Sequence, residues 1–223
     1  MLAAATSFGV SHLVYTISGA AYVYHDDNPV PLREEDEIRG NPEFAYSDHK
    51  RLVEELLARH RRDHPELAQL VFRPGTILGD TVANPITAIF ERPVVVGVRG
   101  SDSPFVIVWD TDVAECIVTG IHERRTGIFN LAGDGVITLP EIARRLGKRY
   151  VAVPAPMLAG ALRVLHTLRL TTLGPEQVRF LRYRPVLAND RLKREFGFTP
   201  SATSAECFER YRRGRGATPA EER

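Results

Sequence analysis

Two side chains that can move a proton stand one helical turn apart near the start of the chain. Tyr46 and Lys50 lie in the stretch AYSDHKRLVEELL, whose apolar residues recur at helical spacing. Residues four apart on a helix share a face, and an ammonium held close to a phenol favours the phenolate form. The pair is therefore a candidate acid/base device. The alternative is exposed surface decoration, because Tyr-x-x-x-Lys on a helix is a common pattern.

The elements that would position this pair alternate between short strands and helices. The helix that carries the pair is expected over 46–64, between strands at 12–17 and 67–72, and a long loop over 18–44 precedes it. Further strands are expected at 94–98, 105–109, 127–131 and 150–153, and further helices at 1–8, 85–91, 112–123, 139–147, 156–170 and 175–181, with a short helix ending at Gly197. This alternation is typical of a parallel α/β fold.

Two helix starts carry recognisable capping residues. Asp112 is the predicted N-cap of the helix over 112–123, because a short side-chain oxygen there satisfies a free backbone N–H. Thr138 with Glu141 forms the pattern of a capping box for the helix over 139–147. From Ser201 onward the chain becomes polar and arginine-rich, so 201–223 is predicted to be a frayed, solvated tail.

Composition excludes several classes of protein. The 223 residues carry a net charge of +1, with 43% hydrophobic and 26% charged residues, which are ordinary globular values and predict no nucleic-acid partner. No apolar run approaches the roughly 20 residues that span a bilayer, so no membrane partner is expected. Two distant cysteines, Cys116 and Cys207, predict a reducing, cytoplasmic setting.

No metal site is expected from the sequence. The cluster of His25, Asp26 and Asp27 would need further convergent ligands from elsewhere in the chain. His60 and His64 are one helical turn apart but lack the Glu of an H-E-x-x-H motif, so solvated histidines are the favoured interpretation.

An ordered set of motifs accompanies the Tyr46–Lys50 pair and gives it a context. The set, in chain order, is T-I-S-G-A-A-Y-V-Y (16–24), R-P-G-T-I-L-G (73–79), V-W-D-T-D-V-A-E-C-I (108–117), G-I-F-N-L-A-G (127–133) and N-D-R-L-K-R-E-F-G-F-T-P (189–200). With these motifs the chain resembles the extended short-chain dehydrogenase/reductase family, the NAD-dependent epimerase/dehydratases. The resemblance covers nearly the whole chain.

The resemblance implies an α/β fold with a partial Rossmann-like parallel sheet, flanking helices and a smaller, irregular C-terminal substrate lobe. Residues 1–150 would be the remaining part of the Rossmann-like domain, with a lobe insertion around 81–104. Residues 151–200 would form the substrate lobe, and 201–223 the tail. Relative to the family pattern, about the first hundred residues are not in this chain. A start codon placed too late, a gene remnant and a genuine short form are the three explanations.

The resemblance also implies roles for single residues. Tyr46 would be the acid/base, and Lys50 would bind the nicotinamide ribose and tune Tyr46. Gly75 and Thr76 would lie against the nicotinamide end of NAD or NADP. Ser18 would hydrogen-bond the reacting oxygen if Tyr22 sets the family spacing. If Tyr24 sets it instead, the equivalent position is Ala20 and the site lacks its hydroxyl.

The glycine-rich turn that holds a dinucleotide pyrophosphate is not found in the sequence. The nearest string, Gly133 to Thr138 with the pattern G-x-G-x-x-T, is interpreted as a tight turn before a capped helix. Two functions therefore stay open. One is an NAD(P)-dependent oxidoreductase, epimerase or dehydratase acting on a small molecule, a nucleotide sugar being the family's frequent substrate. The other is a truncated, catalytically impaired binding or interaction protein, for which a homodimer would cover the exposed strand edges.

Overall fold

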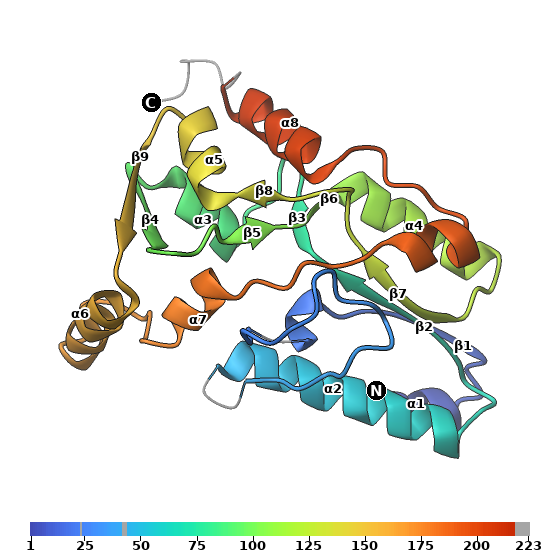
Figure 1. The fold of residues 1–223 in the computed structure, drawn as a ribbon. Helices are drawn as coiled ribbons and strands as arrows, with labels where there is room; N and C mark the ends of the chain where they lie inside the picture. The colour runs from blue at the N-terminus through green and yellow to red at the C-terminus, as the bar shows by residue number, and fades with distance from the viewer. Residues whose placement is uncertain (23, 42–43, 217–223) are drawn as a thin grey trace, which may run out of the picture.

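A three-stranded parallel sheet lies at the centre of the computed structural model, which describes residues 1–22, 24–41 and 44–216. Its strands are β1 (His12–Thr16), β2 (Ala68–Pro74) and β7 (Gly127–Leu131), in the order β1-β2-β7. Val14 pairs with Leu70, and Leu70 pairs with Gly127. The middle strand β2 is buried almost throughout, as its run of apolar residues requires. Figure 1 shows the three strands side by side.

Helix α2 (Ala45–Asp63) covers one face of this sheet (Figure 1). Successive side chains of a strand point to opposite faces, so Gln69, Val71 and Arg73 of β2 share the face toward α2. Val71 packs in one cluster with Leu57 of the helix. Arg61 of the helix donates a hydrogen bond of 3.1 Å to the Gln69 side chain. The alternation of β2 therefore fixes which face the helix occupies.

The other face is covered by α4 (Asp110–His122) and by a short π-helix, η2 (Leu192–Phe196). Leu70 and Phe72 of β2 pack there with Cys116 and Phe196. Gly120 lets α4 approach the sheet closely, because a Cβ at this position would overlap Cδ2 of Leu70.

A second core lies beyond the carboxyl end of β2. Gly75 joins β2 to β3 (Thr76–Leu78), which pairs in parallel with β6 (Ile107–Trp109). A Cβ on Gly75 would stand 2.7 Å from the Val106 carbonyl oxygen, so this junction needs a glycine. Around these strands pack the antiparallel pair β5 (Pro104–Phe105) and β8 (Ile137–Thr138), with α3 (Pro85–Glu91), α5 (Leu139–Arg145) and α8 (Ser204–Gly216).

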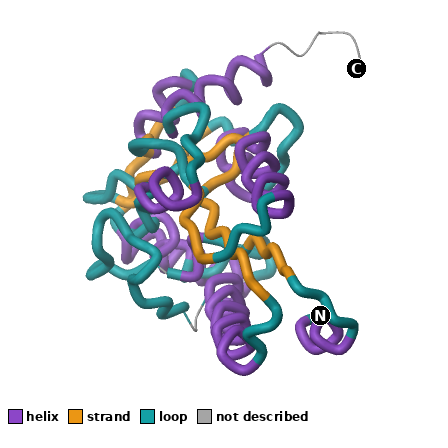
Figure 2. The backbone as a smooth tube through the Cα atoms, turned by 90° about the vertical axis from the view of Figure 1, so that its right-hand side faces the viewer, coloured by secondary structure: helices purple, strands orange, loops and turns teal. Residues whose placement is uncertain are grey.

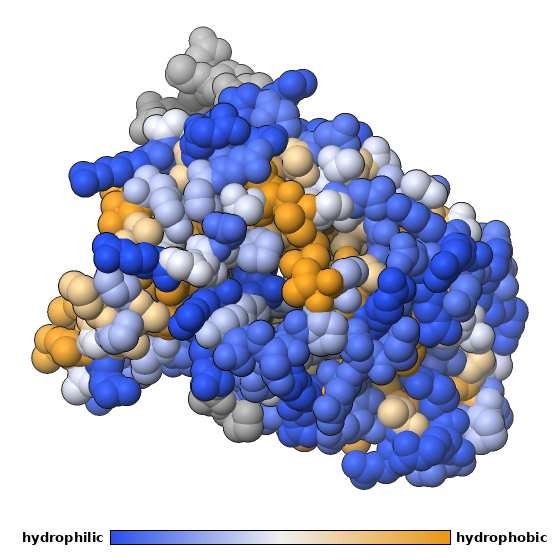
Figure 3. All heavy atoms as spheres, viewed as in Figure 1, coloured by the Kyte–Doolittle hydropathy of each residue, from blue (hydrophilic) through white to orange (hydrophobic). Residues whose placement is uncertain are grey.

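The remaining elements are peripheral. Strands β4 (Val94–Val98) and β9 (Arg149–Val153) form a parallel pair, and α6 (Ala155–Thr167) and α7 (Gln177–Arg182) follow it. Helix α6 buries none of its residues and brings apolar side chains to the surface at the left of Figure 3. Helix α1 (Leu2–Ser7) projects away from the rest of the protein next to the outer edge of β1, as Figure 2 shows. A 3-10 turn, η1 (Gly19–Ala21), follows β1.

The predicted α/β architecture with parallel strands is confirmed, and three elements have the predicted bounds: α3, β4 and β7. The predicted strand 105–109 is divided between β5 and β6. The division of the chain into a Rossmann-like part and a substrate lobe stays a prediction. None of the helices in the described ranges combines the length and apolar composition needed to cross a bilayer.

Two local predictions are wrong, and both fail because a tertiary contact outweighs a local preference. Asp112 is not an N-cap, since α4 begins at Asp110 and the buried Asp112 carboxylate accepts hydrogen bonds from the backbone N–H and the hydroxyl of Ser201. Within the tail that was predicted to fray over 201–223, the structure forms α8 over Ser204–Gly216, and residues 217–223 lie outside the described residues. Cys207 and Phe208 on that helix are fully buried in the second core.

The predicted capping box at α5 is present in part. Thr138 is the N-cap, and its hydroxyl accepts a hydrogen bond of 3.3 Å from the Glu141 backbone N–H. The Glu141 side chain accepts hydrogen bonds from Arg145, one turn further along the helix.

Candidate functional site

Tyr46 and Lys50 share one face of α2, as their spacing requires. Tyr46 is in the first turn and is 52% exposed. The Lys50 Nζ atom lies 5.3 Å from the centroid of the Tyr46 ring, a cation–π distance. The arrangement therefore presents a phenol to solvent with an ammonium over its ring.

A hydrogen bond from the neighbouring residue ties this end of α2 to the turn that follows β1. Ser47 is fully buried, and its Oγ donates to the Ala20 carbonyl oxygen over 2.7 Å. Ser18 is the N-cap of that turn, η1, where its Oγ accepts a hydrogen bond of 3.1 Å from the Ala20 backbone N–H. The Ser47–Ala20 hydrogen bond therefore holds the first turn of α2, which carries Tyr46, against the turn that is capped by Ser18. Sequence reasoning missed Ser47, whose signal was a small polar residue on the inner face of an amphipathic helix.

Tyr22 and Tyr24, which gave the two alternative positions for the catalytic hydroxyl, are both buried. The Tyr22 hydroxyl donates to Oδ1 of Asn130 over 2.9 Å and accepts a hydrogen bond of 2.6 Å from Nη1 of Arg73. Arg73 in turn forms a buried ion pair with Glu54 of α2. Burial raises the pKa of Tyr22 to about 12, so this phenol stays protonated and acts as a structural hydrogen-bonding group in the core.

Tyr24 lies in an aromatic cluster. Its ring packs edge-on against Phe44 and Phe180, with centroid distances of 5.5 and 5.2 Å. Burial raises the pKa of Tyr24 to about 12 as well. The choice between Ser18 and Ala20 stays a prediction. Of the two, Ser18 is partly exposed, whereas Ala20 is buried.

Gly75 and Thr76 follow the carboxyl end of β2, and Ser18 follows the carboxyl end of the adjacent parallel strand β1. Ligands of open α/β sheets bind at this edge. The Gly75 backbone N–H donates a hydrogen bond to the Leu131 carbonyl oxygen, and the Thr76 backbone N–H donates one to the Val106 carbonyl oxygen. The Thr76 hydroxyl accepts a hydrogen bond of 3.2 Å from Nη2 of Arg184. Arg184 is a second residue that the sequence did not single out.

The contacts of Tyr46 and Lys50 with NAD or NADP stay a prediction. What the structure shows is an exposed phenol with an ammonium over its ring. The G-x-G-x-x-T string suits no phosphate, since a Cβ on Gly133 would stand 2.6 Å from the Ala202 carbonyl oxygen and Thr138 is engaged as the cap of α5. Within 1–22, 24–41 and 44–216 we find no glycine-rich cradle for the pyrophosphate.

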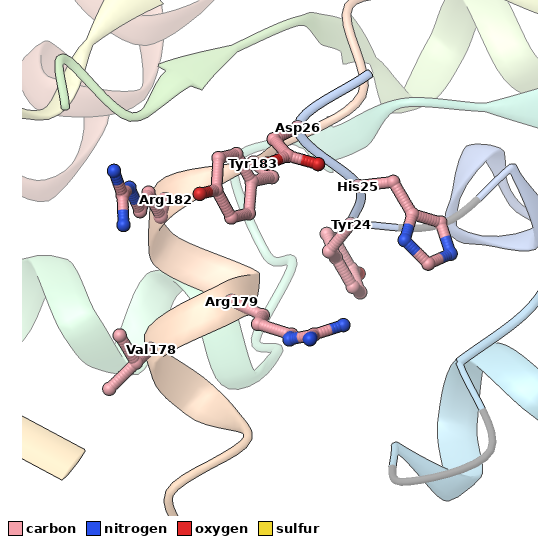
Figure 4. A pocket seen from close by; sticks show the side chains of 7 residues that line it. All are labelled: Tyr24, His25, Asp26, Val178, Arg179, Arg182 and Tyr183. Carbon is pink, nitrogen blue, oxygen red and sulfur yellow. The ribbon is translucent and has the colours of Figure 1, made fainter. Parts of the chain in front are cut away.

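A cavity of about 300 Å³ lies beside this region, between the loop after η1 and helix α7. It is lined by Tyr24, His25, Asp26, Val178, Arg179, Arg182 and Tyr183. Figure 4 shows Arg179 extending from α7 toward Tyr24, whereas Arg182 extends the other way. Tyr46, Lys50 and Ser18 are not among the lining residues.

The acidic residues next to this cavity do not converge on a metal position. Asp27 forms an ion pair with Arg39, whose hydrogen bonds hold the pKa of that carboxyl below its usual range. Among the described residues no group of three or more His, Cys, Asp or Glu side chains is placed to hold a metal ion.

Comparison with curated proteins finds distant relatives in mycobacteria. An uncharacterised protein of Mycobacterium tuberculosis (strain H37Rv) is 28% identical over 162 residues, which cover 71% of this chain and 42% of the relative. A second uncharacterised protein of the same strain is 26% identical over 168 residues, covering 74% of this chain and 18% of the relative. The chain thus spans less than half the length of the curated relatives it matches.

Solved structures of similar fold cover almost the whole chain. MoeE5 in complex with UDP-glucose and NAD matches 96% of this chain and 68% of its own, at 15% identity and a TM-score of 0.68. The dTDP-glucose 4,6-dehydratase of Bacillus anthracis in complex with NAD matches 96% of this chain and 65% of its own, at 16% identity and a TM-score of 0.69. These likenesses show the fold. Residues 1–132, more than half of the chain, match the model of the NAD dependent epimerase/dehydratase family, and the chain belongs to that family.

Proposed function

We propose that this protein acts as an NAD(P)-dependent oxidoreductase, epimerase or dehydratase on a small molecule, with Tyr46 as its acid/base. The observation that carries the proposal is the exposed Tyr46 phenol with the Lys50 ammonium 5.3 Å from its ring. The hydrogen bond from Ser47 to Ala20 supports it, because it ties this pair to the turn that begins at Ser18.

Each residue has one task in this proposal. Tyr46 holds or moves a proton at the substrate oxygen. Lys50, whose Nζ lies over the Tyr46 ring, binds the nicotinamide ribose, and Ser18 orients the reacting oxygen. When bound, NAD(P) supplies a hydride acceptor or donor. Nucleotide sugars are the proposed substrate class, since UDP-glucose is bound by a solved protein of the same fold.

Thermal unfolding with and without NAD, NADH, NADP and NADPH tests the cofactor part. A ligand at 100 times its dissociation constant adds roughly 2.7 kcal/mol to the free energy of unfolding. A shift with one coenzyme pair supports the proposal, and no shift with any of the four contradicts it for this chain.

Substitution of the phenol tests the catalytic part. Tyr46→Phe removes only the hydroxyl of an exposed side chain, so turnover is expected to vanish while the melting temperature stays unchanged. Tyr15→Phe, on the sheet, is the matched control and should keep turnover. Retained activity in Tyr46→Phe would remove the role assigned to the phenol.

A second function is favoured by the outer edge of the sheet. Within the described residues β1 pairs only with β2, so its other edge is open. A groove of about 600 Å³ runs along this edge, lined by Phe8, Gly9, Val10, Ser11, His12, Val14, Ile121 and Arg124. Phe8 is 86% exposed. Because unpaired strand edges invite pairing, we propose a homodimer formed through β1 as the interaction role.

Sedimentation separates this role from a monomeric enzyme. Ile121→Glu places a charge in the groove and should convert a dimer into monomers. Val164→Glu changes an equally exposed apolar residue on α6 and should leave the dimer intact. A wild-type protein that sediments as a monomer at micromolar concentration contradicts the interaction role.

A further inference from the structure

Helix α6 is apolar on the side that faces solvent as well as on the side that faces the protein. Its partly buried residues include Leu158 and Leu162, which are one helical turn apart. The solvent side carries four exposed apolar residues at spacings of four, three and four, which place them on one helix face: Met157, Ala161, Val164 and Leu168. Met157 is 66% exposed, Val164 59% and Leu168 62%. A helix that is apolar all round is ordinarily buried, whereas α6 buries none of its residues.

The apolar surface continues into the loop that joins α6 to α7. Leu170 is 70% exposed, and Leu173 is exposed as well. Figure 3 shows apolar side chains gathered at the left of the molecule, where Figure 1 places α6. Exposed apolar residues that are scattered singly need no explanation, but residues gathered on one face mark an interaction surface.

The charged residues around this surface are almost all arginines. From residue 149 to residue 175, which covers β9, α6 and most of the following loop, the chain has three arginines and no Asp or Glu. Arg163 lies on α6 and Arg169 directly after it, and both are exposed. Helix α7, which packs against α6, adds two more exposed arginines, Arg179 and Arg182. Glu176 is the one carboxylate between residues 149 and 182, so the surroundings of the apolar face are positively charged.

These features favour an anionic lipid surface over a second protein molecule as the partner of α6. A second copy of the chain would bring the same arginines against each other, whereas anionic headgroups complement them. The exposed face of α6 also consists of aliphatic residues and a methionine, without the Trp and Tyr residues that anchor protein interfaces. A helix with an apolar face and basic residues beside it lies in the plane of a membrane interface.

We propose that α6 and the loop after it dock this protein on an anionic membrane surface. The apolar face of Met157, Val164 and Leu168 enters the headgroup region, and Arg163 and Arg169 contact lipid phosphates. The protein lies on the bilayer and does not cross it. The lack of a bilayer-spanning run, from which no membrane partner was predicted, does not bear on this mode of binding, because an interfacial helix needs only one apolar face.

Co-flotation with lipid vesicles tests the proposal on the wild-type chain. Vesicles of equimolar phosphatidylcholine and phosphatidylglycerol are the anionic probe, and vesicles of phosphatidylcholine alone are the neutral one. The chain should bind the anionic vesicles more tightly, and added salt should weaken this binding because it screens the arginines. Absence of binding to the anionic vesicles, or equal binding to both kinds, overturns the proposal.

Val164→Gln tests the apolar face without changing the charge. The variant should bind anionic vesicles about tenfold more weakly, because it no longer transfers a valine side chain from water into lipid. Val164→Leu should bind at least as tightly as wild type. Val118→Gln changes an apolar residue of α4 that is 52% exposed and is the matched control, with wild-type binding expected. Equal binding by Val164→Gln and wild type contradicts the role of α6.

Arg163→Gln tests the charge beside the apolar face. Its affinity for anionic vesicles should fall about fivefold, the contribution of one basic residue near a charged membrane surface. Arg62→Gln removes an exposed arginine from α2 and should leave the affinity unchanged. Equal losses in the two variants would show attraction by the whole protein and overturn the assignment to α6. Each of these substitutions changes an exposed side chain, so the melting temperatures should match that of wild type.

Sedimentation without lipid distinguishes the membrane from a second copy of the chain. Self-association that Val164→Gln abolishes and Ile121→Glu leaves intact would assign α6 to a protein interface and overturn the proposal. A sedimentation coefficient that Val164→Gln leaves unchanged supports the lipid surface. Vesicle binding requires neither coenzyme nor turnover, so Tyr46→Phe should bind vesicles like wild type, and the outcome is independent of the proposed catalytic function.

Discussion

The Ser47 hydroxyl donates a 2.7 Å hydrogen bond to the Ala20 carbonyl oxygen, and both residues are buried. This contact joins the first turn of α2 to the turn after β1. It decides where Tyr46 stands relative to Ser18, although Ser47 itself is not assigned to touch substrate. It is therefore a positioning contact, and its loss should affect stability and turnover to different extents.

Ser47→Ala should lower the free energy of unfolding by about 1–3 kcal/mol, because it leaves the buried Ala20 carbonyl without a partner. At temperatures where the variant is folded, turnover should fall by more than the loss of stability explains. The reason is that the first turn of α2 is no longer held by the hydrogen bond to the Ala20 carbonyl oxygen. Urea unfolding and steady-state kinetics measure the two effects. His49→Gln, an exposed change two residues later, should alter neither. Full turnover in a folded Ser47→Ala would contradict the positioning role.

The buried ion pair between Arg73 and Glu54 ties β2 to α2 through hydrogen bonds of 2.6 and 3.1 Å. Glu54→Ala leaves the guanidinium buried without its counter-charge, so the free energy of unfolding should fall by about 3–5 kcal/mol. Glu55→Ala, the next residue along, removes an exposed surface pair with Arg51 and should cost no more than about 1 kcal/mol. Chemical denaturation compares the two. Equal losses would show that solvent reaches the Arg73–Glu54 pair in the folded protein.

Glu34 should give the stability a pH dependence whose sign follows from the burial of its carboxylate. Its carboxylate accepts a hydrogen bond of 2.8 Å from the Asn130 backbone N–H, and burial raises its pKa above the ordinary carboxyl range. Because the folded state then binds the proton more tightly than the unfolded chain, this group favours folding at low pH and disfavours it as pH rises through the folded pKa. Glu34→Gln should therefore be more stable than wild type at pH 7, with the difference disappearing below about pH 4.

Unfolding transitions at several pH values check this expectation. Glu35→Gln, its exposed neighbour, should show the wild-type pH profile. A Glu34→Gln variant less stable than wild type at pH 7 would mean that the ionised carboxylate is a net stabilising partner of Asn130.

The two cysteines should be unreactive in the folded protein. Cys116 and Cys207 are both fully buried, and burial raises the pKa of Cys116 to about 12 and that of Cys207 to about 11. The thiolate is the reactive form, so a disulfide reagent should modify neither residue at pH 8 until the chain unfolds. Labelling in native buffer and in denaturant measures this. Rapid native labelling of Cys207 alone would show that α8 opens locally.

Some features of the protein are settled within a few residues of sequence. Helix α3 and strands β4 and β7 have the expected bounds because capping residues, apolar runs and turn residues act locally. The common face of Tyr46 and Lys50 follows from helix geometry alone. The order of motifs likewise carried the family resemblance, which the match over residues 1–132 confirms.

Tertiary contacts decided the rest, since each involves residues far apart in the chain. The Asp112 carboxylate accepts a hydrogen bond from the Ser201 backbone N–H and does not cap α4. The polar stretch after Ser201 forms a helix because Cys207 and Phe208 pack in the second core. No periodic pattern in the sequence indicates the contact between Ser47 and Ala20. The same is true of the packing of Arg184 between Phe105 and Phe180. Local patterns set which segments become helices and strands. Long-range packing alone sets which polar groups are buried together, and therefore where the chemistry stands.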